Sequence, residues 1–127
     1  MIQRLGSGGR WEELYGYSRV VKAGPWVLTA GCTATVDGVV KHVGDPYAQT
    51  LLAFEIALDA AGQYGVIAEH VARTRMFVVG GPDNADAAGR AHVAIFRDLR
   101  PAATLVLVPG LLHPDMLVEV EVEAYAP

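Results

Sequence analysis

The chain has 127 residues, of which 52% are hydrophobic and 19% charged, and this length suits a single domain spanning residues 1–127. Its net charge of −4 comes without a basic run, which argues against nucleic acid as a partner. No apolar stretch is long enough to span a bilayer and the amino terminus lacks a secretory core, so we expect a cytoplasmic protein with no membrane partner.

The amino-terminal third of the chain predicts three short strands. Residues 18–22 and 26–30 flank a Gly-Pro turn, and residues 39–43 follow the turn signal Asp37-Gly38. The stretch Gly6-Ser7-Gly8-Gly9-Arg10 follows no strand and lacks the ending of a phosphate loop, so it predicts a flexible start. The adjoining Arg10-Trp11-Glu12 is a candidate cover for a pocket entrance.

Two helices are predicted further along. Asp45 and Pro46 form an N-cap and first-turn pair, after which apolar residues recur at helical spacing to Gly62. A second helix covers residues 84–99 and ends before Pro101. The residues expected to face inward are Tyr47, Leu51, Phe54, Leu58 and Ala61 in the first helix and Ala88, His92, Ile95, Phe96 and Leu99 in the second.

Residues 71–79, 103–108 and 117–125 predict the remaining strands. The resulting order, three strands, helix, strand, helix and two strands, favours an α+β fold. In it, one mixed six-stranded sheet carries both helices on one face. Because 52% of the residues are hydrophobic, we expect more apolar surface than one small core can bury, and therefore a homo-oligomer.

Two strands of the predicted sheet have faces of different character. Valines at 118, 120 and 122 and Ala124 alternate with Glu119, Glu121 and Glu123, which puts three carboxylates on the face away from the helices. In the same way Arg73, Arg75 and Phe77 share one face, opposite Ala72, Thr74, Met76 and Val78. This charged face is either solvated with weak surface pairs, or covered by neighbouring subunits with ion pairs that are costly to break singly.

A series of short motifs carries a resemblance to a known family. They are Tyr15-Gly16-Tyr17-Ser18, Leu28-Thr29-Ala30-Gly31, Asp45 with Gln49-Thr50, Ala60-Ala61-Gly62, Arg73-Thr74-Arg75-Met76-Phe77-Val78, Arg100-Pro101-Ala102 and Val120-Glu121-Val122-Glu123-Ala124. In this order and spacing the chain resembles the YjgF/RidA family, also called the L-PSP endoribonuclease family. The resemblance implies a chorismate-mutase-like fold and a homotrimer with a central β-barrel. It also implies small-molecule pockets at the subunit interfaces.

The resemblance also implies an activity, which is cofactor-free hydrolysis of 2-enamine or 2-imine acids to 2-keto acids and ammonia. Tyr17 matches the family's pocket tyrosine and Glu121 its water-orienting glutamate, so these two are the expected catalytic residues. The residues expected to bind substrate are Gly31, Cys32, Arg75, Phe77 and Ala103.

Two of these positions depart from the family. Ala103 stands where the family has its carboxylate-binding arginine, and Cys32 replaces a usual glutamine. Because a methyl group cannot bind a carboxylate, the sequence predicts a divergent activity on another small molecule. Arg75 either replaces the lost guanidinium or forms structural pairs with the glutamates.

Other readings of the sequence remain open. A non-catalytic, small-ligand-binding trimer is the main alternative, and endoribonuclease activity is less favoured because the chain is acidic. Cys32 is either a nucleophile or a buried, inert thiol. His42, His70, His92 and His113 have no paired spacing, so neither a metal nor a cofactor is expected. His113 lies either at a pocket rim or in a solvated loop.

Overall fold

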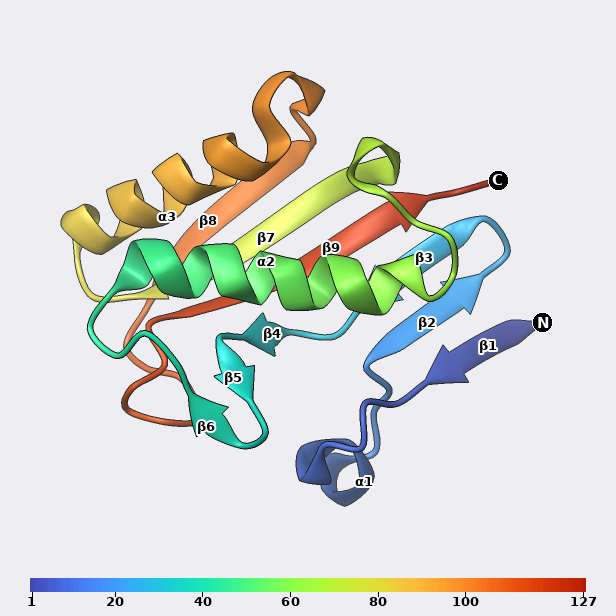
Figure 1. Cartoon of the computed structure of the whole chain (residues 1–127), viewed down its shortest axis with the longest axis horizontal. Helices are drawn as coiled ribbons and strands as arrows, with labels where there is room; N and C mark the ends of the chain where they lie inside the picture. The colour runs from blue at the N-terminus through green and yellow to red at the C-terminus, as the bar shows by residue number, and fades with distance from the viewer.

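The structure is a computed structural model that describes all 127 residues. Seven strands form one mixed sheet in the order β1-β2-β3-β9-β7-β8, and β4 also pairs with β9 (Figure 1). The strands are β1 (Ile2–Leu5), β2 (Val20–Ala23), β3 (Trp26–Thr29), β4 (Cys32–Thr33), β5 (Thr35–Val36), β6 (Val39–Val40), β7 (Val71–Val79), β8 (Ala102–Val108) and β9 (Val118–Tyr125). The helices are α1 (Arg10–Tyr15), α2 (Pro46–Gly62) and α3 (Pro82–Phe96), with 3-10 turns at Ala68–His70 and Arg97–Leu99.

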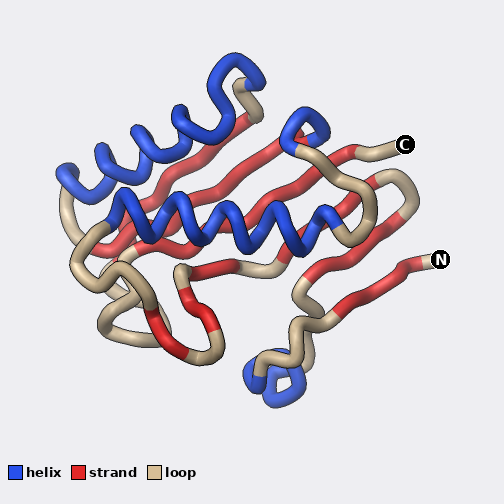
Figure 2. The backbone as a smooth tube through the Cα atoms, viewed as in Figure 1, coloured by secondary structure: helices blue, strands red, loops and turns tan.

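Helices α2 and α3 lie side by side on the same face of the sheet, as predicted, so the fold is α+β with two layers (Figure 2). β7 pairs with β8 in parallel and with β9 antiparallel, which makes the sheet mixed. No helix combines the length and apolarity that a membrane-spanning segment requires.

Helix α2 begins where the sequence predicts. Asp45 caps it by accepting a hydrogen bond from the Ala48 amide at 3.0 Å, and Pro46 occupies the first turn. Its buried face differs from the predicted stripe, because Tyr47, Leu51 and Leu58 are only half-buried. The residues packed most closely against the sheet are Gln49, Thr50, Ala53, Phe54, Ala57, Ala60 and Ala61. Small side chains on this face let the helix backbone approach β9 closely.

Gln49 is a fully buried polar residue that ties α2 to two loops. Its amide nitrogen donates to the Asp115 carbonyl at 2.8 Å and to the carbonyls of Lys41 and His42 at 3.2 and 3.3 Å. Its side-chain oxygen accepts from the Leu117 amide at 2.8 Å. The loop between β8 and β9 is thereby fixed to the first turn of α2.

Strands β7 and β9 confirm the predicted two-faced pattern. Val118, Val120, Val122 and Ala124 are all at most 1% exposed beneath the helices, and the glutamates between them face the other side. In β7, Thr74, Met76 and Val78 share the buried face. The placement of Ala72 there was wrong, because an irregularity between Val71 and Arg73 shifts the register and leaves Ala72 exposed.

Three other expectations need correction. The amino terminus contains a strand that the sequence did not predict, since β1 pairs with β2 as an edge strand, and residues 6–9 link it to α1 without regular structure. The run at residues 39–43 is not part of the main sheet, because β6 pairs only with β5. The main sheet consequently has seven strands rather than six, with β1 and β4 added and β6 removed.

Helix α3 begins at Pro82, two residues before the predicted start, and Phe96 closes it. Phe96 and His92 pack with Phe54 of α2, with ring centroids 4.7 to 5.6 Å apart. Leu99 was expected to face inward but is 42% exposed, because the chain leaves the helix at Arg97.

Candidate functional site

A hollow of about 320 Å³ lies where β3 gives way to β4. It is lined by Tyr17, Ala30, Gly31, Leu112 and Glu119. Tyr17 follows α1, Leu112 belongs to the loop held by Gln49, and Glu119 lies in β9. Segments from four parts of the chain therefore meet at one interruption of the sheet.

The interruption itself explains how the hollow forms. β9 pairs first with β3, where Leu28 lies opposite Glu123, and then with β4, where Thr33 lies opposite Glu119. Ala30 and Gly31 belong to neither strand, so the chain bends away from the ladder between them. A Cβ atom on Gly31 would overlap the Glu119 carboxylate, and only glycine leaves room for that side chain.

The carboxylate of Glu119 makes no hydrogen bond or salt bridge within the chain, although the residue is half-buried. Burial raises its pKa above the ordinary value; Arg19 opposes this shift and the neighbouring Glu121 adds to it. An acid whose charged form is disfavoured and which lacks an internal donor is suited to exchange protons with a ligand.

Arg19 lies beside the hollow without lining it, since it contacts Gly31 and lies over the Tyr17 ring. Its Nη1 donates to the Gly31 carbonyl at 2.5 Å and to Cys32 Sγ at 3.3 Å, while its Nε lies 3.4 Å from Glu12. Glu12 in turn accepts hydrogen bonds from the amide and hydroxyl of Ser7. Burial alone would raise the pKa of Glu12, but the bonds from Ser7 and the charge of Arg19 together lower it. Two guanidinium nitrogens of Arg19, Nε and Nη1, are therefore engaged by partners within the chain.

The sequence analysis missed Arg19, although the hairpin contained the signal. Val20 pairs with Thr29 across the β2–β3 turn, and continuing that register by one residue places Arg19 beside Ala30. The Ala30 amide indeed donates to the Arg19 carbonyl at 2.9 Å. The sequence left Cys32 open as a nucleophile or a buried, inert thiol. Its Sγ has the Arg19 cation beside it, but the residue is only 2% exposed. Burial raises the pKa of the Cys32 thiol despite the attraction of Arg19, which agrees with an inert thiol.

The other predicted site residues lie apart from the hollow. Arg75 contacts Glu121 at 2.9 Å and Glu123 at 2.7 Å on the helix-free face, which matches the ion-pair reading of Arg75. These hydrogen bonds to Glu123 and Glu121 raise the pKa of Arg75. Phe77 lies opposite Glu119 across the β7–β9 pair, one strand away from Gly31. Ala103 is exposed in the edge strand β8, opposite Thr74.

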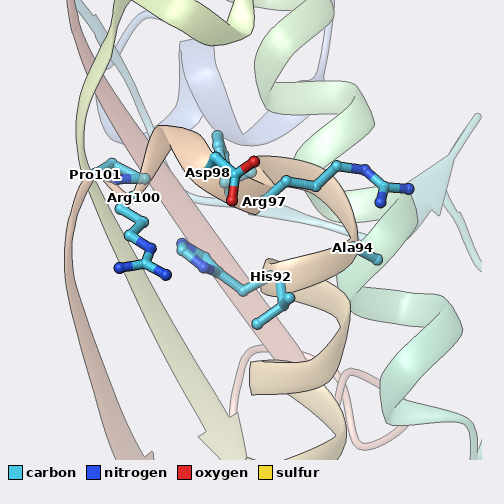
Figure 3. A pocket seen from close by; sticks show the side chains of 8 residues that line it. His92, Ala94, Arg97, Asp98, Arg100 and Pro101 are labelled. Carbon is cyan, nitrogen blue, oxygen red and sulfur yellow. The ribbon is translucent and has the colours of Figure 1, made fainter.

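A second hollow of about 570 Å³ lies at the end of α3 and is lined by His92, Val93, Ala94, Phe96, Arg97, Asp98, Arg100 and Pro101. Figure 3 shows the side chains of Arg97 and Arg100 extending in different directions, with their guanidinium groups well separated in the view. His92 uses its Nε2 for a 2.8 Å hydrogen bond with Thr74 Oγ1. Because its polar groups do not converge, we place the candidate site at the Tyr17 hollow instead.

No group of three or more His, Cys, Asp or Glu side chains in the structure is arranged to hold a metal ion. His113 is in the loop before β9, where its Nδ1 accepts from the Asp115 amide at 3.0 Å. It is exposed and does not line either hollow, in keeping with the solvated-loop reading.

Comparison with known proteins identifies relatives in sequence and in structure. The profile of the family described as Endoribonuclease L-PSP matches residues 10–126. An uncharacterised protein from Streptomyces coelicolor is 44% identical over 124 residues, covering 98% of this chain and 92% of its own. The crystal structure of a member of the YjgF/YER057c/UK114 family from Mycobacterium tuberculosis is 35% identical. It aligns with a TM-score of 0.87 over 99% of this chain and 100% of that one.

A Rid-family protein of unknown function from Yersinia pestis shares the fold, with 21% identity and a TM-score of 0.79 over 87% of this chain and 88% of that one. The fold and the hollow define a two-layer α+β protein with a small, mostly apolar cleft that holds one acidic side chain at a strand interruption. The chain belongs to the Endoribonuclease L-PSP family, which is also the YjgF/RidA family. The family expected from the short motifs is therefore confirmed.

Proposed function

We propose that this protein is a cofactor-free hydrolase that converts a small imine or enamine to the corresponding carbonyl compound and ammonia. The observation that supports this most strongly is the unpaired, half-buried carboxyl of Glu119 beside Tyr17 and the Gly31 backbone. A hollow of about 320 Å³ has the size of a small-metabolite site, and the net charge of −4 argues against endoribonuclease activity.

In the proposed reaction Glu119 accepts a proton from water as the water oxygen bonds to the C=N carbon. For a protonated imine this gives a neutral carbinolamine. Glu119 returns the proton to nitrogen and then accepts the hydroxyl proton as the C=O bond forms, the C–N bond breaks and ammonia leaves. Tyr17 confines the substrate against Ala30 and Gly31, so that the carbon stays within reach of the attacking water. Imine hydrolysis has a low barrier, which makes positioning and one acid–base group sufficient.

Glu121 is the alternative water-orienting carboxylate, since the family resemblance assigns that role to its position. Glu121 lies two residues from Glu119 on the same face of β9, but its carboxylate is engaged by Arg75 at 2.9 Å. Glu119 has no such partner and lies in the hollow itself, so we assign the proton transfer to Glu119. In this assignment Arg75 and Phe77 have a structural role on the adjoining face of β7.

We further propose that residues 1–127 act as one cytoplasmic domain that assembles as a homotrimer, with the ligand bound at subunit interfaces. The helix-free face of the sheet carries exposed apolar side chains between its ion pairs. They include Trp26, Leu28, Val106 and Tyr125, each between 37% and 45% exposed. Covering such a face by sister subunits would bury these side chains and desolvate the Arg75 pairs.

A non-catalytic ligand-binding trimer is the second candidate, and Ala103 favours it. This residue is exposed in β8 and provides no charged or polar group where the family resemblance expects an arginine. A protein that kept the hollow but lost turnover would bind ligand without forming product. Restoring an arginine by Ala103→Arg would then give no activity.

The test of hydrolysis is a competition assay on imines made in situ by an amine oxidase or an amino acid oxidase. Semicarbazide traps the free imine, so an active hydrolase lowers semicarbazone formation and accelerates ammonia release. We expect Glu119→Gln to lose at least about tenfold of this acceleration, within the range that general acid–base groups contribute. Glu55→Gln, an exposed change on α2, is the matched control and should retain full activity.

Two outcomes would contradict the assignment. If Glu121→Gln abolishes the acceleration while Glu119→Gln retains it, then Glu121 is the catalytic carboxylate. If no imine from either oxidase is hydrolysed faster with the protein than without it, the hydrolase proposal is wrong.

A further inference from the structure

The charges around the Tyr17 hollow indicate which ligands can enter it. Glu119 is the only charged residue among the five that line it, and the other four are Tyr17, Ala30, Gly31 and Leu112. A ligand bearing a carboxylate would therefore place its negative charge near another negative charge, with no lining cation to compensate.

The nearest cation does not change this conclusion. Arg19 does not line the hollow, although its guanidinium carbon lies 5.7 Å from the centroid of the Tyr17 ring. It directs Nη1 to the Gly31 carbonyl and Cys32 Sγ and Nε toward Glu12. Its side chain is only 16% exposed. A guanidinium held by three partners cannot also form the two-pronged contact that fixes a carboxylate.

Strand β7 carries two further guanidinium groups on this side of the sheet, Arg73 opposite Glu123 and Arg75, which is also engaged. Both contacts of Arg75 use Nη1, one to Glu121 and one to Glu123, and neither partner lines the hollow. The single positive charge of Arg75 is therefore shared by Glu121 and Glu123, and Glu119 forms no ion pair. A positively charged ligand would supply the missing charge.

We propose that the Tyr17 hollow selects a small ligand with a protonated nitrogen, an ammonium or iminium group without a carboxylate, which donates to the Glu119 carboxylate. This inference rests on the location given to the site in the proposed function, and it adds the chemical class of the ligand. The aromatic ring of Tyr17 and the apolar side chain of Leu112 would contact the uncharged part of that ligand.

Gly31 makes this arrangement possible. A Cβ at position 31 would overlap the Glu119 carboxylate, so Gly31→Ala should push the carboxylate out of the hollow while leaving its charge in the protein. Gly31→Ala therefore tests where the carboxylate lies, whereas Glu119→Gln tests whether its charge is needed.

The test is a binding titration that does not depend on turnover. Benzylamine, benzyl alcohol and benzoate are titrated separately into the whole protein, and the backbone amide signals of Ala30, Gly31 and Leu112 are followed by NMR. We expect benzylamine to shift these signals at the lowest concentration, benzyl alcohol to bind more weakly and benzoate to bind least. Glu119→Gln should weaken benzylamine about tenfold or more, as expected for loss of a hydrogen bond to a charged group. Gly31→Ala should weaken it similarly, and Glu55→Gln should not change it.

Two outcomes would overturn the proposal. Benzoate binding as tightly as benzylamine would mean that a cation, such as one from a sister subunit, completes the site. Unchanged benzylamine affinity in Glu119→Gln would mean that this carboxylate does not recognise the ligand. The hydrolase proposal is tested separately. A protein that binds benzylamine selectively but hydrolyses no imine would support the proposed positively charged ligand and contradict only the proposed hydrolysis.

Discussion

Arg75 donates from a single guanidinium nitrogen to Glu121 at 2.9 Å and to Glu123 at 2.7 Å, linking β7 to β9 on the face that the helices leave uncovered. In an isolated chain such a pair would be weak, because its members are about one-third exposed. Between subunits it would lose its water and become costly to break singly.

Charge reversal at Arg75 tests whether this face is an interface. Arg75→Glu would place a third carboxylate between Glu121 and Glu123, so we expect the proposed trimer to dissociate in sedimentation experiments at micromolar concentration. Arg90→Glu is the matched control, because Arg90 forms an exposed pair with Asp86 on α3 and should leave assembly intact. A wild-type protein that sediments as a monomer would contradict the trimer directly.

Replacing Glu119 should stabilise the folded protein at neutral pH. Burial raises the pKa of Glu119, so the folded state binds a proton more tightly than the unfolded state does. Stability therefore falls as pH rises from about 4.3, the ordinary glutamate pKa, through the raised folded value. We expect Glu119→Gln to have the higher Tm at pH 7 and to lose that advantage near pH 4. A lower Tm than wild type at pH 7 would mean that the carboxylate has a stabilising partner.

Gln49 should be one of the most sensitive polar positions in the chain. Gln49→Leu removes its bonds to Asp115 and Leu117 and leaves buried backbone groups without partners. We expect a loss of about 3 kcal/mol in the free energy of unfolding, measured by urea denaturation. Gln63→Leu changes the same side chain at the exposed end of α2 and should cost little. Equal effects of the two substitutions would show that the buried bonds contribute little.

His92 should make the fold sensitive to mild acid. Burial lowers its pKa, so the unfolded state binds protons more readily than the folded state. The contribution of His92 to the free energy of unfolding is therefore fully present above about pH 6.5, the ordinary histidine pKa. It declines as the pH falls below that value. We expect His92→Gln to flatten this decline in urea titrations at several pH values. His42→Asn, at an exposed left-handed residue with φ of 54°, should leave the decline unchanged.

Much of the fold could be predicted because its signals are local. The alternation of valine and glutamate from Val118 onward defines both faces of β9, and Asp45-Pro46 defines the start of α2. The amino-terminal strand could not be predicted in the same way. Ile2–Leu5 is held by its pairing with β2, so its structure depends on a partner strand rather than on its own residue pattern.

The site was less predictable, for a physical reason. The alternation correctly placed Glu119, Glu121 and Glu123 on one face, but it cannot tell which of them a distant arginine will neutralise. The choice depends on the register between β7 and β9, which puts Arg75 opposite Glu121. It also depends on the break between β3 and β4, which opens space at Glu119 alone. Tyr17 and Gly31 were predicted together, and the structure brings them together.

Leu112 is 75% exposed at the mouth of the hollow, on a loop whose far end is anchored by Gln49. The rim is thus a replaceable side chain on a fixed support, while Gly31 and Glu119 form the floor. Evolution can exchange the rim residue for a larger or more polar one without disturbing the core or the acid group. Relatives with the same fold can in this way come to accept differently shaped molecules through a single change.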